Sequence, residues 1–511
     1  MRRRILVLAF GLVIVLAAAS GAAADVDPLS VVTGPTPFAS GCNGAPQTGT
    51  LYPNAEVEPW VEVNPTRRSN LVAVWQQDRW DNGGAQGNLT GVSDDRGRTW
   101  SRPTPPPFSR CAGGNADNGG DYERATDPWV SFSPNGRAHQ IALSFNDSNP
   151  SNAVLVSSSR DGGRTWGPIK TLIRDTDIRF FNDKESITAD PTDSRFVYAV
   201  WDRLFVPDPA GETFFGPTLL ARSTNGGRTW ERPRVILDPG ENNQTIGNQI
   251  AVLPNGDLIN AFDLIIGDSL HVAVQRSRNK GRSWSPPVIV NPLGTIGVVD
   301  PRDGAPVRTG DILPEIAVDP RKGKRTVYLV WQDARFTGAD QVVLSRSTNG
   351  GRTWSAPTLV SENPATQAFT PSVEVDRHGN VGVTYYDFTS DTVASPTLDT
   401  DYWFTRSGDR GATFSARERV TATSFDMRSA PFAGGFFVGD YEGLDSAGRT
   451  FKPVFGVANT GNQANPTDML ATTVRPPFGN TPATEVLSRV GAADARRTPG
   501  QLRGVAPARR R

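Results

Sequence analysis

Short runs of alternating apolar and polar residues recur along most of the chain. Examples are LVAVW at 71–75, FVYAVW at 196–201 and TVYLVW at 326–331. Alternation with a period of two over such short runs is typical of half-buried β-strands. The runs are separated by turn residues, and the 511-residue chain contains 51 Gly and 41 Pro. The pattern therefore predicts an all-β protein with turns at short intervals.

Six near-copies of one octapeptide, S-x-(D/N)-x-G-x-(T/S)-(W/F), lie between these runs. Their first residues are 54 to 70 positions apart, which leaves room for one four-stranded sheet per copy. In a tight turn the Ser and Asp or Asn side chains bond to the backbone, and the Gly adopts a positive φ. The final Trp or Phe is expected to be buried between neighbouring sheets. The six copies begin at Ser93, Ser159, Ser223, Ser277, Ser347 and Ser407.

These octapeptides resemble the Asp-box, or bacterial neuraminidase repeat, of the sialidase superfamily. The resemblance covers the chain from Ser93 to Phe414. It implies a β-propeller, in which each repeat forms one blade. It implies no single activity, since similar repeats occur in xyloglucan-degrading enzymes, sortilin-like receptors and photosystem assembly factors.

The strand pattern also predicts the number of blades. Inner strands are expected to begin at Trp60, Pro128, Glu185, Asn248, Pro314 and Pro371. After the sixth octapeptide, three more strands begin at Tyr441, Phe451 and Asp468, and the segment 28–38 resembles the outer strands. We therefore expect seven four-stranded blades closed by an N-terminal strand, with six blades as the alternative.

The two ends of the chain differ in composition from the repeats. Three arginines, an apolar run over 5–19 and small residues up to Ala24 predict a signal peptide over 1–24, with a retained membrane anchor as the alternative. The propeller is expected over 25–476. Residues 477–511 are rich in Arg, Ala and Pro and are expected to be disordered, either as a solvated tail or as a weak adhesive for acidic envelope polymers. We expect a secreted or cell-envelope monomer without an integral membrane segment after signal removal.

Charge and cysteine content narrow the functional classes. Lys plus Arg equals Asp plus Glu, at 53 each, which gives no overall field for nucleic acid. The only two cysteines, Cys42 and Cys111, follow outer strands of neighbouring blades and are expected to form a disulfide. Three scattered histidines offer no zinc site, and we expect no cofactor. Calcium at the acidic channel mouth described next is an open alternative.

Charged residues gather where the inner strands begin, on the face opposite the octapeptides. These residues, with one tyrosine, are Glu58, Asp127, Asp183, Glu185, Asp311, Glu315, Asp440, Tyr441 and Glu442. Arg79, Arg203 and Arg335 follow second strands on the same face. Guanidinium groups bind carboxylates through paired hydrogen bonds, so three around one opening suit an acidic sugar.

The resemblance implies an exo-α-sialidase type of glycoside hydrolase acting on terminal acidic sugars. Sialidases use a Tyr nucleophile and an Asp acid/base. By position we assign Tyr441 as nucleophile, Glu315 or Glu185 as the group that polarises it, and Asp127 as acid/base. Arg79, Arg203 and Arg335 are assigned to the substrate carboxylate.

A non-catalytic propeller that binds a glycan, peptide or envelope component is the alternative function. The stretch 51–63 contains no arginine where sialidases usually carry one, and one fold hosts many functions. In that case the carboxylates accept hydrogen bonds from loop amides and form ion pairs with the arginines. Four tryptophans are candidates either for sugar stacking or for blade packing: Trp80, Trp129, Trp201 and Trp331.

Overall fold

The regular secondary structure between Ala24 and Pro476 consists almost entirely of short antiparallel strands. The computed structural model describes residues 24–208 and 210–476, and within them the only helix is the 3-10 turn η1 (Met427–Ser429). Nothing helical in this part is long and apolar enough to cross a bilayer. The expected signal peptide, apart from Ala24, and the expected C-terminal tail lie outside the described residues. The all-β class predicted from the alternating pattern is confirmed.

Two large sheets form the first half of this unit. The first sheet runs in order through β3 (Leu51–Val63), β4 (Leu71–Trp80), β5 (Ala85–Ser93), β6 (Arg124–Phe132), β7 (Ala138–Phe145), β8 (Asn152–Ser159) and β9 (Lys170–Asp175). The second contains β10 (Phe180–Ala189), β11 (Val197–Phe205), β12 (Phe215–Gly216), β13 (Thr218–Ser223), β14 (Arg234–Leu237), β15 (Asn243–Val252), β16 (Leu258–Ile266), β17 (Ser269–Ser277) and β18 (Val288–Pro292).

Four smaller sheets form the second half. One contains β21 (Glu315–Val318), β22 (Val327–Asp333), β23 (Gln341–Ser347) and β24 (Thr358–Leu359). The next contains β25 (Ala368–Val375), β26 (Val381–Asp387), β27 (Asp399–Ser407), β28 (Glu418–Arg419) and β29 (Phe425–Asp426). Another contains β1 (Asp25–Val26), β2 (Ser30–Val31), β31 (Gly443–Ala447), β32 (Thr450–Ala458), β33 (Thr467–Ala471) and β34 (Val474–Arg475). A three-stranded sheet contains β19 (Val298–Val299), β20 (Pro306–Arg308) and β30 (Phe436–Phe437).

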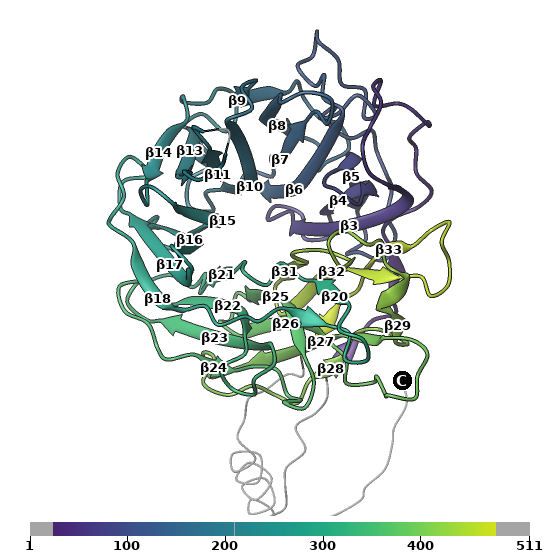
Figure 1. The fold of residues 1–511 in the computed structure, drawn as a ribbon. Helices are drawn as coiled ribbons and strands as arrows, with labels where there is room; N and C mark the ends of the chain where they lie inside the picture. The colour runs from purple at the N-terminus through teal and green to yellow at the C-terminus, as the bar shows by residue number, and fades with distance from the viewer. Residues whose placement is uncertain (1–23, 209, 477–511) are drawn as a thin grey trace, which may run out of the picture. The chain divides into compact units, whose positions relative to one another are not determined.

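The sheets stand radially, with their first strands around a common centre (Figure 1). Strands β3, β6, β10, β15, β21, β25 and β31 each contact the next one in this series, and β31 contacts β3. The N-terminal strand β2 pairs antiparallel with β33, so both ends of the described chain belong to one sheet. This arrangement is that of a propeller.

All six octapeptides form the same turn. In each copy the Ser Oγ accepts a hydrogen bond from the Gly N–H four residues later, at 2.7–2.9 Å. The Asp or Asn side chain accepts from the backbone N–H four residues after it, at 2.9–3.0 Å. The six glycines have φ between 75° and 91°, a region that residues with a Cβ rarely adopt. The mechanical role predicted for the motif is therefore confirmed.

The ring that ends each octapeptide packs against a different hydrophobic cluster. Trp166, for example, packs against Val72, Val92 and Val130, which come from two successive four-strand units. Burial of such a ring ties one unit to the next. The others are Trp100, Trp230, Trp284, Trp354 and Phe414.

The octapeptide turns lie beside the turns that join first and second strands. Arg67, between β3 and β4, pairs with Asp94, and Lys280 pairs with Asp190, between β10 and β11. These turns are at the ends of the inner strands, whereas the expected site residues are near their beginnings. The octapeptides and the candidate site therefore lie at opposite ends of the inner strands.

Cys42 and Cys111 form the predicted disulfide, with their Cα atoms 4.8 Å apart. The bond links the segment after β2 to the loop after β5 across a sequence separation of 69 residues. Cross-linking a loop of this length restricts the unfolded chain, so loss of the bond is expected to lower the free energy of unfolding by about 2–4 kcal/mol. Urea unfolding of the Cys42→Ala/Cys111→Ala variant measures this loss. The reduced wild type should match the variant, and an unchanged midpoint would contradict the expectation.

Candidate functional site

Five inner strands carry a β-bulge at the same point along their length. Each bulge contains one residue with a left-handed backbone: Glu58 in β3, Asp127 in β6, Lys184 in β10, Gly247 in β15 and Thr370 in β25. For a residue other than glycine this conformation costs about 1–3 kcal/mol. Bulges redirect side chains and are frequent beside functional sites. Here they turn three charged side chains toward one another.

Lys184 is the centre of a buried ion cluster. Its Nζ lies 3.1 Å from Glu58 Oε1, 3.0 Å from Asp127 Oδ1 and 2.8 Å from Asp440 Oδ2. The Glu58, Asp127 and Asp440 side chains are at most 5% exposed, and that of Lys184 is 12% exposed. Four strongly buried ionisable groups from β3, β6, β10 and the segment before β31 therefore meet at one point.

The cluster determines the protonation of its members. Burial disfavours the Lys184 ammonium, but Asp127, Asp440 and Glu58 raise its pKa well above the ordinary value. Burial also opposes ionisation of Asp440, yet Lys184 and Arg308 lower its pKa well below the usual range. For Glu58, burial outweighs the attraction of Lys184 and raises the pKa to about 8.

Two guanidinium groups surround the ion cluster. Arg308 donates from Nε to Asp440 Oδ1 at 2.9 Å, and its guanidinium carbon lies 4.4 Å from the Phe437 ring centre. Arg79 lies 5.1 Å from the same ring centre and donates to Gln76, which in turn donates to Glu58. The Phe437 ring thus offers cation–π contacts to both guanidinium groups.

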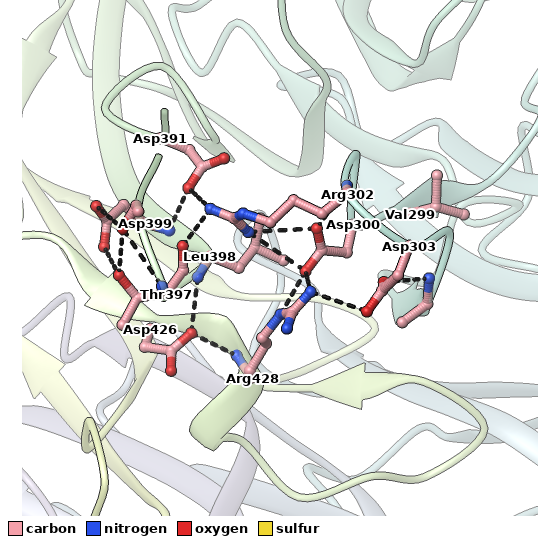
Figure 2. Close-up of polar contacts among 12 residues, drawn as sticks. Val299, Asp300, Arg302, Asp303, Asp391, Thr397, Leu398, Asp399, Asp426 and Arg428 are labelled. Carbon is pink, nitrogen blue, oxygen red and sulfur yellow. Dashed lines mark hydrogen bonds and ion pairs between the residues drawn. The ribbon is translucent and has the colours of Figure 1, made fainter. Parts of the chain in front are cut away.

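Arg308 is held in place by the small sheet of β19, β20 and β30. Two arginines attach the β19–β20 turn to the neighbouring sheet, as Figure 2 shows. Arg428 bonds to Asp300 and Asp303, and Arg302 bonds to Asp300 and Asp391. β20 pairs in parallel with β30, which places Arg308 opposite Phe437. The network in Figure 2 therefore supports the sheet that carries Arg308 to Asp440.

A narrow cavity beside the ion cluster brings together all four residues predicted to be catalytic. Asp127, Glu185, Glu315 and Tyr441 line it, along with Lys184, Trp129 and Gln249. The Trp129 and Tyr441 ring centres are 5.2 Å apart, and Trp60 stacks on Trp129 at 3.4 Å with its ring centre 6.2 Å from that of Tyr441. Aromatic rings and carboxyl groups therefore share one wall.

Glu185 differs from every other carboxyl group in this cavity. It is 2% exposed, and neither carboxyl oxygen has a hydrogen-bond partner among the described residues. Burial, with the nearby Asp127, raises its pKa well above the ordinary value. Glu315 is also buried, and its pKa is raised to about 8, but it accepts a hydrogen bond from Gln249 Nε2 at 3.0 Å. Burial thus favours the protonated form of Glu185, and its carboxyl group has no hydrogen-bond partner within the described residues.

The assignment of Tyr441 as nucleophile stays a prediction, and its surroundings are those of a buried phenol. Its hydroxyl donates to the Pro128 carbonyl at 3.5 Å, and its side chain is almost fully buried. Burial, followed by Glu58, Asp127 and Glu185, raises the pKa of the phenol well above its ordinary value. The phenol therefore keeps its proton.

The three arginines predicted to bind a substrate carboxylate do not share one location. Arg79 lies beside the ion cluster and is linked to Glu58 through Gln76. Arg203 pairs with Asp175 and stacks on Phe180, whereas Arg335 pairs with Asp333. Of the three, the structure brings only Arg79 to the centre.

Only one of the four candidate stacking tryptophans reaches the cavity. Trp129 lines it, whereas Trp201 and Trp331 are completely buried in hydrophobic clusters. Trp80 lies under the guanidinium of Arg124, with a carbon-to-ring-centre distance of 4.6 Å. Packing explains these three rings.

Sequence reasoning missed Lys184 and Arg308. Lys184 stands between two residues that it did identify, Asp183 and Glu185, and occupies the same bulge position as Glu58 and Asp127. Comparison of the bulge positions would have found it. Arg308 precedes β21 by several residues and carries no equivalent signal.

The calcium alternative gains no support from the arrangement of ligands. Within residues 24–208 and 210–476, no three or more His, Cys, Asp or Glu side chains are placed to hold a metal ion.

Comparisons with known proteins find similarity only among solved structures. No protein-family model and no curated protein matches the chain. A protein of unknown function from Dyadobacter fermentans has a TM-score of 0.46 at 14% identity, over 69% of this chain and 95% of its own. A Hadza microbial sialidase has a TM-score of 0.45 at 16% identity, over 79% and 73%. An α-L-arabinanase from Penicillium chrysogenum has a TM-score of 0.41 at 13% identity, over 88% and 98%. The functional proposals below rest on the geometry of this chain alone.

Proposed function

We propose that this protein is a glycoside hydrolase whose active centre is the cavity lined by Asp127, Glu185, Trp129 and Tyr441. One observation carries the proposal: two carboxyl groups that line the same cavity have different surroundings. Asp127 is ion-paired with Lys184, whereas neither carboxyl oxygen of Glu185 has a hydrogen-bond partner among the described residues and burial raises its pKa. Environments that separate two carboxyl groups in this way are how acid and base roles are divided in such enzymes.

The chemistry follows from this division. Glu185 donates its proton to the glycosidic oxygen as the bond between that oxygen and the anomeric carbon breaks. Asp127 stabilises the positive charge that develops on the sugar and takes a proton from the water that adds to the anomeric carbon. Trp129 and Tyr441 form the aromatic lining beside these carboxyl groups, and in this proposal Tyr441 is not the nucleophile.

The substrate is proposed to end in a neutral sugar. Lys184 is the only cation among the described residues that line the cavity, and three carboxyl groups already surround it. A substrate carboxylate would therefore meet no unpaired cation. The exo-α-sialidase specificity expected from the octapeptides is the competing proposal, and the assay below separates the two.

We also infer a seven-bladed propeller over 25–476, from the seven inner strands that contact one another in sequence and from the β31–β3 contact. Export is supported by the Cys42–Cys111 disulfide, because such bonds persist in oxidising compartments.

Hydrolysis of fluorogenic glycosides tests the function. Purified wild-type protein is expected to release 4-methylumbelliferone from at least one neutral pyranoside or furanoside, and Asp127→Asn is expected to lower kcat about 100-fold or more. Release from the N-acetylneuraminic acid derivative alone would replace the neutral-sugar proposal with the acidic one. No release from any substrate, together with saturable binding on a glycan array, would favour the non-catalytic propeller.

A further inference from the structure

Two adjoining cavities at the octapeptide end of the protein share three arginines. Arg137 comes from the turn between β6 and β7, and Arg160 and Arg228 come from the second and third octapeptides. Arg195 lines only one of the cavities, and Lys170 lines only the other. We call these five residues and the two cavities the arginine groove.

The three shared arginines have no acidic partner. Among the described residues, no carboxylate forms an ion pair with Arg137, Arg160 or Arg228, although Arg195 pairs with Asp193. Arg137 donates instead to the Gly226 carbonyl. Partial burial and then the nearby Arg160 and Arg228 lower the pKa of Arg137. Like charges are thus held together without compensation, which favours a bound anion.

We propose that the arginine groove binds an anionic glycan chain through the sulfate or carboxylate groups of that chain. Guanidinium groups bind both oxyanions through paired hydrogen bonds. Ser194 and Thr224 line one of these cavities and suit sugar hydroxyl groups. Because one set of arginines borders both cavities, the groove fits a chain with several anionic groups better than a single small ion.

Other polyanions fit the groove less well. Single-stranded nucleic acids are usually held by aromatic rings that stack on the bases, and no aromatic side chain lines either cavity in the described chain. A membrane surface would require large exposed apolar side chains beside the cations, and in the described chain the apolar side chains that line these cavities are those of Val156, which is buried, and Pro168. The disulfide also suits a partner outside the reducing cytoplasm.

A double variant with a matched control tests the groove. Arg160→Ala/Arg228→Ala removes two exposed side chains at octapeptide positions two and six. Arg278→Ala/Arg352→Ala makes the same changes at the same positions two octapeptides further on, where Asp257 lies among the arginines. Both variants change the net charge equally, and neither alters the cavity proposed for hydrolysis.

The measurement is isothermal titration with a heparin octasaccharide and with a hyaluronan octasaccharide, which carries carboxylates but no sulfates. We expect the wild type to bind at least one of them, and Arg160→Ala/Arg228→Ala to bind about tenfold or more weakly because charge-assisted hydrogen bonds are lost. The control variant should stay within about twofold of the wild type, since its arginines lie outside the groove.

Four results would overturn the proposal. The first is that the wild type binds neither octasaccharide, and the second is that both double variants lose affinity equally. The third is that inorganic sulfate binds as tightly as the octasaccharides. The fourth is that duplex DNA binds as tightly as the octasaccharides and loses the same affinity in Arg160→Ala/Arg228→Ala. Glycoside hydrolysis is measured separately in both variants and should be unchanged, so failure of the groove and failure of the proposed hydrolase are distinguishable.

Discussion

Replacement of Lys184 by methionine is expected to lower the free energy of unfolding by about 3–5 kcal/mol, because buried charges lose their partner. Glu58, Asp127 and Asp440 all lie within 3.1 Å of the Lys184 Nζ and are at most 5% exposed. Methionine retains most of the side-chain volume, so the loss reports charge rather than packing. Urea unfolding near pH 7.5 measures it.

Lys280→Met is the matched control for this prediction. Lys280 also has a left-handed backbone and pairs with a buried carboxylate, Asp190, at 2.7 Å. Asp190 keeps bonds from Tyr198 and Thr192 when the lysine is removed, so the expected loss is less than half as large. Equal losses in the two variants would contradict the central role of Lys184.

The pH dependence gives a second readout for Lys184→Met. Without the ammonium, the pKa of Glu58 should rise further above its unfolded value than the present shift to about 8. The folded state then binds more protons than the unfolded state, so stability falls as pH rises above the ordinary Glu value of about 4.3. Up to about pH 8 the wild type shares this slope, because its Glu58 is also raised, and above pH 8 only the variant keeps it. The deficit should therefore grow as the pH rises above about 8, and a deficit independent of pH there would contradict the electrostatic explanation.

Most of the fold was predictable because it depends on local patterns. Alternation along VYAVW or LVAVW predicts a strand without any knowledge of where the segment lies in the folded protein. The octapeptide contains every group that its turn needs: the Ser hydroxyl, the Asp or Asn oxygen and the Gly with positive φ. The pairing of β2 with β33 was visible because segment 28–38 resembles the outer strands.

The site was only partly predictable because side-chain direction depends on bulges and on distant contacts. Position at the start of inner strands was enough to place Asp127, Glu185, Glu315 and Tyr441 around one cavity. The same reasoning grouped Arg335 with Arg79, but Arg335 forms an ion pair with Asp333, two residues before it, and is held there. Arg308 depends on the pairing of β20 with β30, which are more than 120 residues apart.

Glu185→Gln is expected to lower kcat by a factor of about 10²–10⁴, because the proton donor to the leaving group is removed. Glutamine has nearly the shape of a protonated glutamic acid, and Glu185 has no bond to lose among the described residues. Stability should therefore be unchanged near neutral pH. The loss should be large for glycosides with alkyl leaving groups and small for dinitrophenyl glycosides, whose leaving groups need no proton. Steady-state kinetics on both substrate types measure the difference.

Glu315→Gln distinguishes catalysis from burial. Glu315 lines the same cavity, is also buried and has a raised pKa, but its carboxyl group accepts a hydrogen bond from Gln249. Its replacement should change kcat much less than Glu185→Gln and equally for both leaving groups. The two variants should also differ in the alkaline limb of the pH–rate profile. Glu315→Gln should keep the wild-type fall in activity, which occurs as Glu185 releases its proton, whereas Glu185→Gln should lack it because glutamine has no such proton. If the fall in kcat of Glu185→Gln does not depend on the leaving group, Glu185 is not the general acid. The proposed pair of carboxyl groups would then have no proton donor.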